Sequence, residues 1–148
     1  MNTPKTIAIG CDHAGFEYKE ALRSWLQSEG YVVLNFGTDS PASVDYPDYV
    51  HPLCAAVEDQ QADLGILLCG SANGVAIAAN RHRKIRAAIC WMSDIARLSR
   101  QHNDANVICL PARYVSLDLS KSMVHEFITT SFDGGRHQRR VEKISQFA

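Results

Sequence analysis

The sequence predicts an α/β protein in which a five-stranded parallel sheet is covered by helices on both faces. Five short apolar runs, each typical of a buried strand, alternate with segments whose apolar residues recur at helical spacing. Strands and helices that alternate in this way form right-handed crossovers and a parallel sheet. No internal repeat or low-complexity linker interrupts the 148 residues, so we expect one domain, 1–148, with 134–148 as an arginine-rich C-terminal tail.

The predicted strands are apolar runs bounded by polar or glycine-containing turns. They lie at residues 6–11, 31–36, 64–68, 86–91 and 106–110. The third run is nearly continuous, which is typical of a strand that is buried on both faces of a sheet. Residues 37–46, after the second run, form a polar loop that is long enough to be a functional candidate.

The predicted helices occupy the stretches between these strands. They cover about residues 18–26, 50–57, 75–79, 94–101 and 119–128. Gly30 is the expected end of the first helix, and Ser93 and Ser116 are the expected N-caps of the fourth and fifth. Pro47 and Pro52 indicate that the second helix begins late, with Pro52 in its first turn, where a missing N–H is tolerated.

Composition excludes several classes of partner. A net charge of −1 gives no reason to expect nucleic acid or a membrane surface as a partner, and no apolar run approaches the length of a spanning helix. The N-terminus carries no signal-peptide pattern. The five cysteines are scattered, which favours reduced thiols in a cytoplasmic protein. They are Cys11, Cys54, Cys69, Cys90 and Cys109.

The turn at residues 70–74 follows the central strand and is built from small residues. Cys69 stands at the end of the strand, and a strand–turn–helix unit aligns backbone N–H groups that can hold an anion. The pattern lacks the lysine of a P-loop and the spacing of a dinucleotide site. It predicts a nucleophile or base beside an oxyanion site; the alternative is an ordinary turn with a buried cysteine.

Other polar residues follow the predicted strands, where ligands bind in parallel sheets. Asp12 and His13 follow the first strand, Tyr46 closes the loop after the second, and Arg113 follows the fifth. All of them can share one sheet edge with residues 69–74. Asp12 and His13 can transfer a proton and contact an anion, or they can cap the next helix and face solvent.

Two further groups lie outside the strand ends. His102 stands at a predicted helix C-terminus, where it can complement the helix dipole or act in acid–base chemistry near neutral pH. After the break at 133–135, Arg136 and Arg140 are four residues apart and can clamp a phosphate from one helix face, or form a solvated face. No His, Cys and Asp spacing indicates zinc, so we expect no metal.

Five blocks of the sequence together resemble the type B ribose-5-phosphate isomerase family, which includes galactose-6-phosphate and allose-6-phosphate isomerases. The resemblance covers essentially the whole chain, in the family's order and spacing. The blocks are Gly10-Cys-Asp-His-Ala-Gly15, Asp45-Tyr-Pro-Asp-Tyr49, Cys69-Gly-Ser-Ala-Asn-Gly74, Arg100-Gln-His-Asn-Asp104 and Gly134-Gly-Arg-His-Gln-Arg-Arg140.

This resemblance implies a Rossmann-like three-layer α/β/α sandwich and an aldose–ketose isomerase that needs no cofactor. The substrate would be a phosphorylated sugar, most simply ribose 5-phosphate, which is converted to ribulose 5-phosphate. The alternatives are a six-carbon sugar phosphate or a sugar-phosphate-binding subunit without turnover. The resemblance also implies a homodimer, or a dimer of dimers, whose active sites are shared between subunits.

The resemblance assigns a role to each matching residue. Cys69 matches the base that moves a proton between C2 and C1 through a cis-enediolate, and Ser71 matches a hydroxyl residue that binds the oxyanion. His102, helped by Asp12, matches the group that opens the sugar ring. The remaining matches are oxyanion contacts at Gly70, Ala72, Asn73 and Gly74, substrate contacts at Tyr46 and Asn103, and a phosphate site at His13, Arg113, Arg136, His137 and Arg140.

Ala72 departs from the family pattern, because the family commonly has glycine at this position. If the turn requires a positive φ here, alanine is strained by about 1–2 kcal/mol. Some relatives place a glutamate base where this chain has Val75, which cannot act as one. The sequence therefore leaves Cys69 as the candidate base.

Overall fold

The computed structural model describes residues 3–147, and its centre is a five-stranded sheet in which every pairing is parallel. The strand order is β2-β1-β3-β5-β4. The strands are β1 (Thr6–Cys11), β2 (Val32–Asn35), β3 (Leu64–Cys69), β4 (Ala87–Ile89) and β5 (Val107–Pro111). Each predicted strand is present, and the α/β class predicted from the sequence is confirmed.

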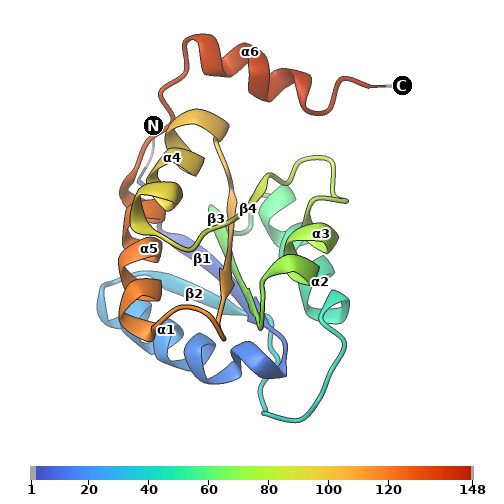
Figure 1. Ribbon diagram of the computed structural model, residues 1–148, viewed down its shortest axis with the longest axis vertical. Coiled ribbons are helices and arrows are strands. Elements are labelled where there is room, and N and C mark those ends of the chain that lie inside the picture. The colour runs from blue at the N-terminus through green and yellow to red at the C-terminus, as the bar shows by residue number, and fades with distance from the viewer. Residues whose placement is uncertain (1–2, 148) are drawn as a thin grey trace.

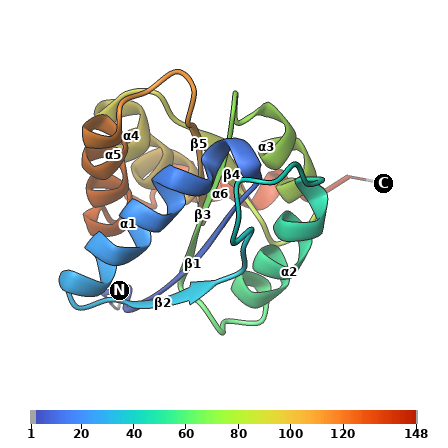
Figure 2. The same cartoon turned by 90° about the horizontal axis from the view of Figure 1, so that it is seen from below.

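Helices cover both faces of the sheet (Figures 1 and 2). They are α1 (Phe16–Ser28), α2 (Pro47–Glu58), α3 (Asn73–Ala79), α4 (Ser93–Asn103), α5 (Leu117–Thr129) and α6 (Arg136–Lys143), with a 3-10 turn η1 (His13–Gly15). Helices α1, α4 and α5 lie on one face, and α2 and α3 lie on the other. Helix α6 lies outside this sandwich, beyond the end of α4 (Figure 1).

Alternating side chains of each strand build a separate core on either side of the sheet. From β1, Ile7 and Ile9 face the core beneath α1, α4 and α5, whereas Ala8 faces the core beneath α2 and α3. All six residues of β3 are buried, as expected for the central strand of a sheet that is covered on both faces. Cys69 ends this strand on the α2–α3 side.

Close backbone approach fixes η1 against the end of β3. A Cβ atom added at Gly15 would lie 2.7 Å from the Cβ atom of Leu68, so only glycine fits at this position. The turn that carries Asp12 and His13 is therefore held beside the strand that ends at Cys69.

Two predicted helix starts are wrong. Helix α2 begins at Pro47, not near Pro52, which lies inside the helix on its exposed side. Proline has no N–H, so the carbonyl of Asp48 receives no helical hydrogen bond from Pro52. Asp48 is also exposed, so water can donate to its carbonyl instead. The N-cap of α4 is Met92 instead of Ser93, because extended Met92 already accepts a hydrogen bond from the N–H of Ala96.

Other predicted helix ends are confirmed. The Ser116 side chain accepts a hydrogen bond from the N–H of Leu119 and caps α5. Gly30, after α1, has a φ of 95°. Gly134 and Gly135 have φ values of 68° and 55°, and α6 follows them, so Arg136 and Arg140 do lie on a helix. Among residues 3–147, no helix combines the length and the apolar character that crossing a membrane requires.

Candidate active site

The turn after β1 places Asp12 at the carboxyl edge of the sheet, partly buried. Its Oδ1 accepts hydrogen bonds from the N–H groups of Ala14 and Gly15, at 2.9 and 3.2 Å, so Asp12 does cap η1. Among the described residues, its Oδ2 has no hydrogen-bond partner. One carboxylate oxygen therefore fixes the turn, and the other is left for a ligand.

His13 is held by the loop that follows β2. Its Nδ1 lies 3.2 Å from the backbone N of Val44, which can only donate. A neutral imidazole that accepts at Nδ1 carries its proton on Nε2, so this contact sets the tautomer of His13. Nε2–H is then a donor suited to an anionic ligand.

Tyr46, at the end of the same loop, packs on the start of α3. A Cβ atom added at Gly74 would lie 2.5 Å from the Cζ atom of Tyr46, so the ring rests directly on the glycine backbone. Tyr46 remains 37% exposed. Its ring therefore covers the turn after β3 and still faces solvent.

Cys69 and the 70–74 turn are anchored to the end of β5. Cys69 pairs with Pro111, and its carbonyl accepts a hydrogen bond of 2.9 Å from the N–H of Ala112. The Gly70 carbonyl accepts from the N–H of Arg113 at 3.1 Å, and the Arg113 side chain packs against Gly70. Arg113 is thus fixed beside the candidate base.

The turn itself presents hydrogen-bond donors. Ser71 Oγ accepts from the backbone N and from Nδ2 of Asn73, at 3.4 and 3.2 Å, which leaves its own O–H free to donate outward. Within residues 3–147, the backbone N–H groups of Ser71, Ala72 and Gly74 have no protein acceptor. Cys69 therefore stands next to several donors that can hold a developing oxyanion.

Ala72 has a φ of 67° and a ψ of −4°, in the left-handed region. The positive φ that strains an alanine is therefore present at this position. The Ala72 side chain is fully buried, so the strain of the backbone is offset by the burial of its methyl group.

A second cluster lies around the end of α4. The imidazole rings of His102 and His137 stack with centroids 4.2 Å apart, and the N–H of Asp133 donates to the carbonyl of Gln101. A pocket of about 340 Å³ opens here. Its lining residues are His102, Asn103, His137, Arg140, Val141 and Ile144. This cluster contains most of the predicted site residues that do not follow a strand.

The two clusters lie at opposite edges of the sheet. Helix α4 returns antiparallel to the strands, so it ends at Asn103, before β5 begins. Cys69 lies at the other end of β5, opposite Pro111, about 13 Å along the strand from Val107 at 3.3 Å per residue. Figure 1 shows α6 at one end of the sheet and the turn between β3 and α3 at the other. One chain therefore does not bring its predicted site residues together.

His102, Asp133 and His137 place potential metal-ligand atoms within 4.8 Å of one another. The two rings are nearly parallel, with an interplanar angle of 11°, so the in-plane lone pairs of their nitrogens do not converge on one point. This arrangement is not a preformed metal centre. Desolvation, and then the neighbouring charges of His102, Arg136 and Arg140, lower the pKa of His137.

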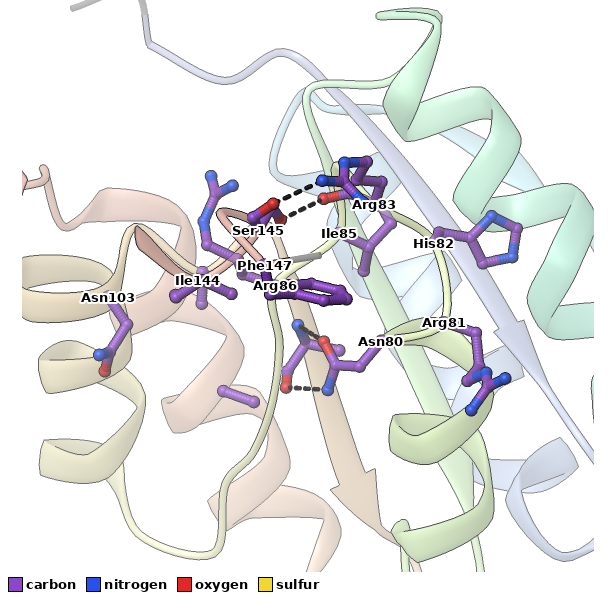
Figure 3. A pocket seen from close by; sticks show the side chains of 13 residues that line it. Asn80, Arg81, His82, Arg83, Ile85, Arg86, Asn103, Ile144, Ser145 and Phe147 are labelled. Atoms are coloured by element: carbon purple, nitrogen blue, oxygen red, sulfur yellow. Dashed lines mark hydrogen bonds between the residues drawn. The ribbon is translucent and has the colours of Figure 1, made fainter. Parts of the chain in front are cut away.

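A larger pocket, of about 480 Å³, is lined by the segment after α3 and by the C-terminal tail (Figure 3). Arg83 and Ser145 are joined by two hydrogen bonds, and the Arg83 guanidinium lies 5.3 Å from the centre of the Phe147 ring. This contact is not predictable from sequence patterns, in which the run of basic residues from 81 to 84 is its only signal. The contact fastens the far end of the tail to the domain.

The other four cysteines are poor candidates for the base. Burial raises the pKa of Cys11, Cys54 and Cys90 to about 12, and burial also raises the pKa of Cys109 well above its usual value. These thiols are fully protonated at neutral pH. Cys69, which is 6% exposed, is the one that borders the donor-lined turn.

Known proteins of one family resemble this chain over nearly its whole length. The model of the ribose/galactose isomerase family matches residues 7–144. Ribose-5-phosphate isomerase B of Escherichia coli is 44% identical over 141 residues, which are 95% of each chain. The crystal structure of a ribose 5-phosphate isomerase from Thermotoga maritima superposes with a TM-score of 0.95 at 48% identity, covering 97% of this chain and 99% of that one.

A further solved structure contains a ligand. Ribose-5-phosphate isomerase B from Mycoplasma genitalium, with bound ribulose-5-phosphate, has a TM-score of 0.92 at 36% identity, covering 98% of this chain and 97% of that one.

The cysteine environments predict selective alkylation. At pH 8, a thiol with a pKa of about 12 is ionised in roughly one molecule in 10⁴. We therefore expect iodoacetamide to modify native protein at Cys69 first, and all five cysteines after denaturation, as measured by peptide mass spectrometry. Modification of Cys11 or Cys54 at the same rate as Cys69 would contradict this assignment.

Because Ala72 has a positive φ, replacing it with glycine should change the free energy of unfolding less than an Ala→Gly substitution in a helix does. Ala72→Gly relieves about 1–2 kcal/mol of strain, which stabilises the fold. Two changes oppose this gain: the loss of a buried methyl group costs about 0.8 kcal/mol, and the greater entropy of the unfolded chain with glycine costs about 0.4–1 kcal/mol. We expect its free energy of unfolding to stay within about 0.5 kcal/mol of wild type. The matched control, Ala55→Gly on the exposed side of α2, should lose about 1 kcal/mol. Equal losses in urea denaturation would argue against strain at Ala72.

Proposed function

The chain belongs to the ribose/galactose isomerase family, and on this premise we propose that it interconverts ribose 5-phosphate and ribulose 5-phosphate without a cofactor. The observation that carries this proposal is the turn at residues 70–74, where a cysteine adjoins a free hydroxyl and unpaired backbone N–H groups. Ribulose-5-phosphate bound to the Mycoplasma genitalium relative supports the choice of a pentose phosphate. We also infer a cytoplasmic location, because all five cysteines are free thiols.

The site is completed, in this proposal, by a second copy of the chain. The carboxyl edge supplies Cys69, the oxyanion donors and His13, and the opposite edge supplies His102 and the arginines of α6. A two-fold dimer can set the carboxyl edge of each copy against the α4–α6 cluster of the other, which makes two equivalent sites. The separation of the two clusters within one chain supports this arrangement.

The reaction then follows from the positions of the groups. His102 of one copy, with Asp12 of the other, assists proton transfer when the sugar ring opens. Cys69 as thiolate takes the C2 proton, the C2–H electron pair forms the C1–C2 double bond, and the C1 carbonyl oxygen becomes an oxyanion. A proton moves between the two oxygens, and Cys69 then returns its proton to C1, leaving a carbonyl at C2.

Two sets of contacts lower the barrier. Each donor aimed at the oxyanion, such as the Ser71 hydroxyl, is worth about 3–4 kcal/mol in the transition state. His13 and Arg113 from one copy, with Arg136, His137 and Arg140 from the other, surround the phosphate. This remote group supplies binding energy that orients the reacting carbons, and Tyr46 and Asn103 contact the sugar between the two ends.

The first functional prediction concerns Cys69. Wild-type protein should convert ribose 5-phosphate faster than allose 6-phosphate or galactose 6-phosphate, and Cys69→Ala should reduce kcat by about 10²–10⁴-fold because the base is lost. Protection of the fold by inorganic phosphate in a thermal-shift assay should persist in this variant. Cys54→Ala, which removes a buried thiol from α2, is the matched control and should retain turnover. Near-normal turnover of Cys69→Ala would eliminate Cys69 as the base.

The second prediction tests the shared site. Cys69→Ala and Arg136→Ala carry defects at opposite edges, so a hybrid dimer contains one intact site and one doubly defective site. After equal mixing, half of the dimers are hybrids, so about a quarter of all sites should be active. Activity is measured before and after subunit exchange, which native mass spectrometry verifies.

The matched control mixes Cys69→Ala with Ser71→Ala. Both defects lie at the same edge, so every hybrid site stays defective and activity should not return. Complete exchange without recovery in the first mixture would show that each site is built within one chain.

A further inference from the structure

Lys19, in α1, is completely buried although its side chain ends in an ammonium group. Lysine is almost never fully buried unless it is paired. Nζ lies 2.9 Å from Asn35 Oδ1, 2.6 Å from the Thr38 carbonyl and 3.0 Å from Asp39 Oδ1. An ammonium group has three protons to donate, and all three are used.

The acceptors of Lys19 lie at the base of the loop after β2, where further hydrogen bonds connect them. Asn35 Oδ1 also accepts from the N–H of Gly37, and Asn35 Nδ2 donates to Asp39 Oδ1 at 2.8 Å. Hydrogen bonds from Asn35 and Lys19 lower the pKa of Asp39, as expected for a member of this network. The network fixes residues 35–39 at the end of β2.

The same loop delivers two contacts to the carboxyl edge. Its residues 40–43 are exposed, and it then places the Val44 N–H on His13 Nδ1 and the Tyr46 ring on Gly74. The path of this loop is therefore set at its base by Lys19 and at its far end by the start of α2. Tyr46 is itself the N-cap residue of α2, whereas Val44 lies between the two fixed ends.

We propose that Lys19 is a positioning residue, which holds the 37–46 loop so that Val44 sets the tautomer of His13 and Tyr46 covers the turn beside Cys69. Its kinetic consequence rests on the proposed function; its effect on the loop does not. The hydrophobic contacts of α1 do not require a charge at this position, because methionine has a similar length and fills a buried site well.

The test is Lys19→Met, compared with Lys121→Met, which removes a lysine from α5 on the outside of the sandwich. We expect Lys19→Met to raise KM for ribose 5-phosphate by about 10-fold or more, with a smaller change in kcat, because misplaced binding groups weaken substrate orientation. Lys121→Met should leave both constants unchanged.

Two measurements on the free protein separate positioning from loss of stability. The ¹⁵N shifts of His13 should report the Nε2–H tautomer in wild type and a mixture of tautomers in Lys19→Met. Hydrogen exchange at the Val44 amide should accelerate, while exchange in β1 and β3 stays slow. Both are measured without substrate, so they remain informative if the protein acts on another sugar phosphate.

Asp39→Asn provides a graded control, because the Asp39 side chain is 71% exposed and Lys19 keeps its other two acceptors. We expect a smaller change in KM than for Lys19→Met. The proposal is overturned if Lys19→Met unfolds at a lower temperature but keeps the His13 tautomer, the Val44 exchange rate and KM of wild type. It is equally overturned if exchange accelerates throughout β1 and β3.

Discussion

The polarity of the parallel sheet determines where every functional group of this chain can lie. All five strands point the same way, so the segments that follow them gather at one edge and the helices return to the other. Cys69 ends a strand and His13 and Tyr46 follow strands, whereas His102 lies in the last turn of a returning helix. No change of side-chain conformation can bridge a separation that equals the length of the sheet. The shared site that we propose would bring the two clusters together across a dimer interface, which one chain cannot do by itself.

The two clusters are held by different means. Around Cys69, close packing of backbone fixes the geometry: Gly15 contacts Leu68, and Gly70 lies beneath Arg113. Helix α6, by contrast, has no buried residue and cannot be held by a core. It is fastened at its start by the stack of His102 and His137, and beyond its end by the contact of Arg83 with Ser145. Arg139 and Arg140 lie between these two attachments, and Arg136 directly precedes the first.

Much of this structure could be predicted from the sequence, because the signals are local. Continuous apolar runs identified the strands, and the small residues of 70–74 identified the turn after β3. The starts of α2 and α4 were mispredicted, because Pro52 is tolerated where its partner carbonyl faces water and Met92 caps through its backbone. Burial of Lys19 could not be predicted, since its acceptors at 35–39 approach it only in the folded sheet.

Ala72 shows how a local rule and a tertiary requirement can conflict at a site. The turn needs a left-handed residue so that the chain can leave β3 and begin α3 with its N–H groups directed outward, and glycine meets that need without strain. The alanine side chain is instead packed in the core beneath α2 and α3, where its methyl group is fully buried. Burial, together with the lower unfolded-state entropy of alanine, then favours alanine by an amount similar to the strain, so either residue permits the same turn. The donors beside Cys69 depend on the path of the backbone, and this explains why the departure from glycine is compatible with the chemistry proposed for the site.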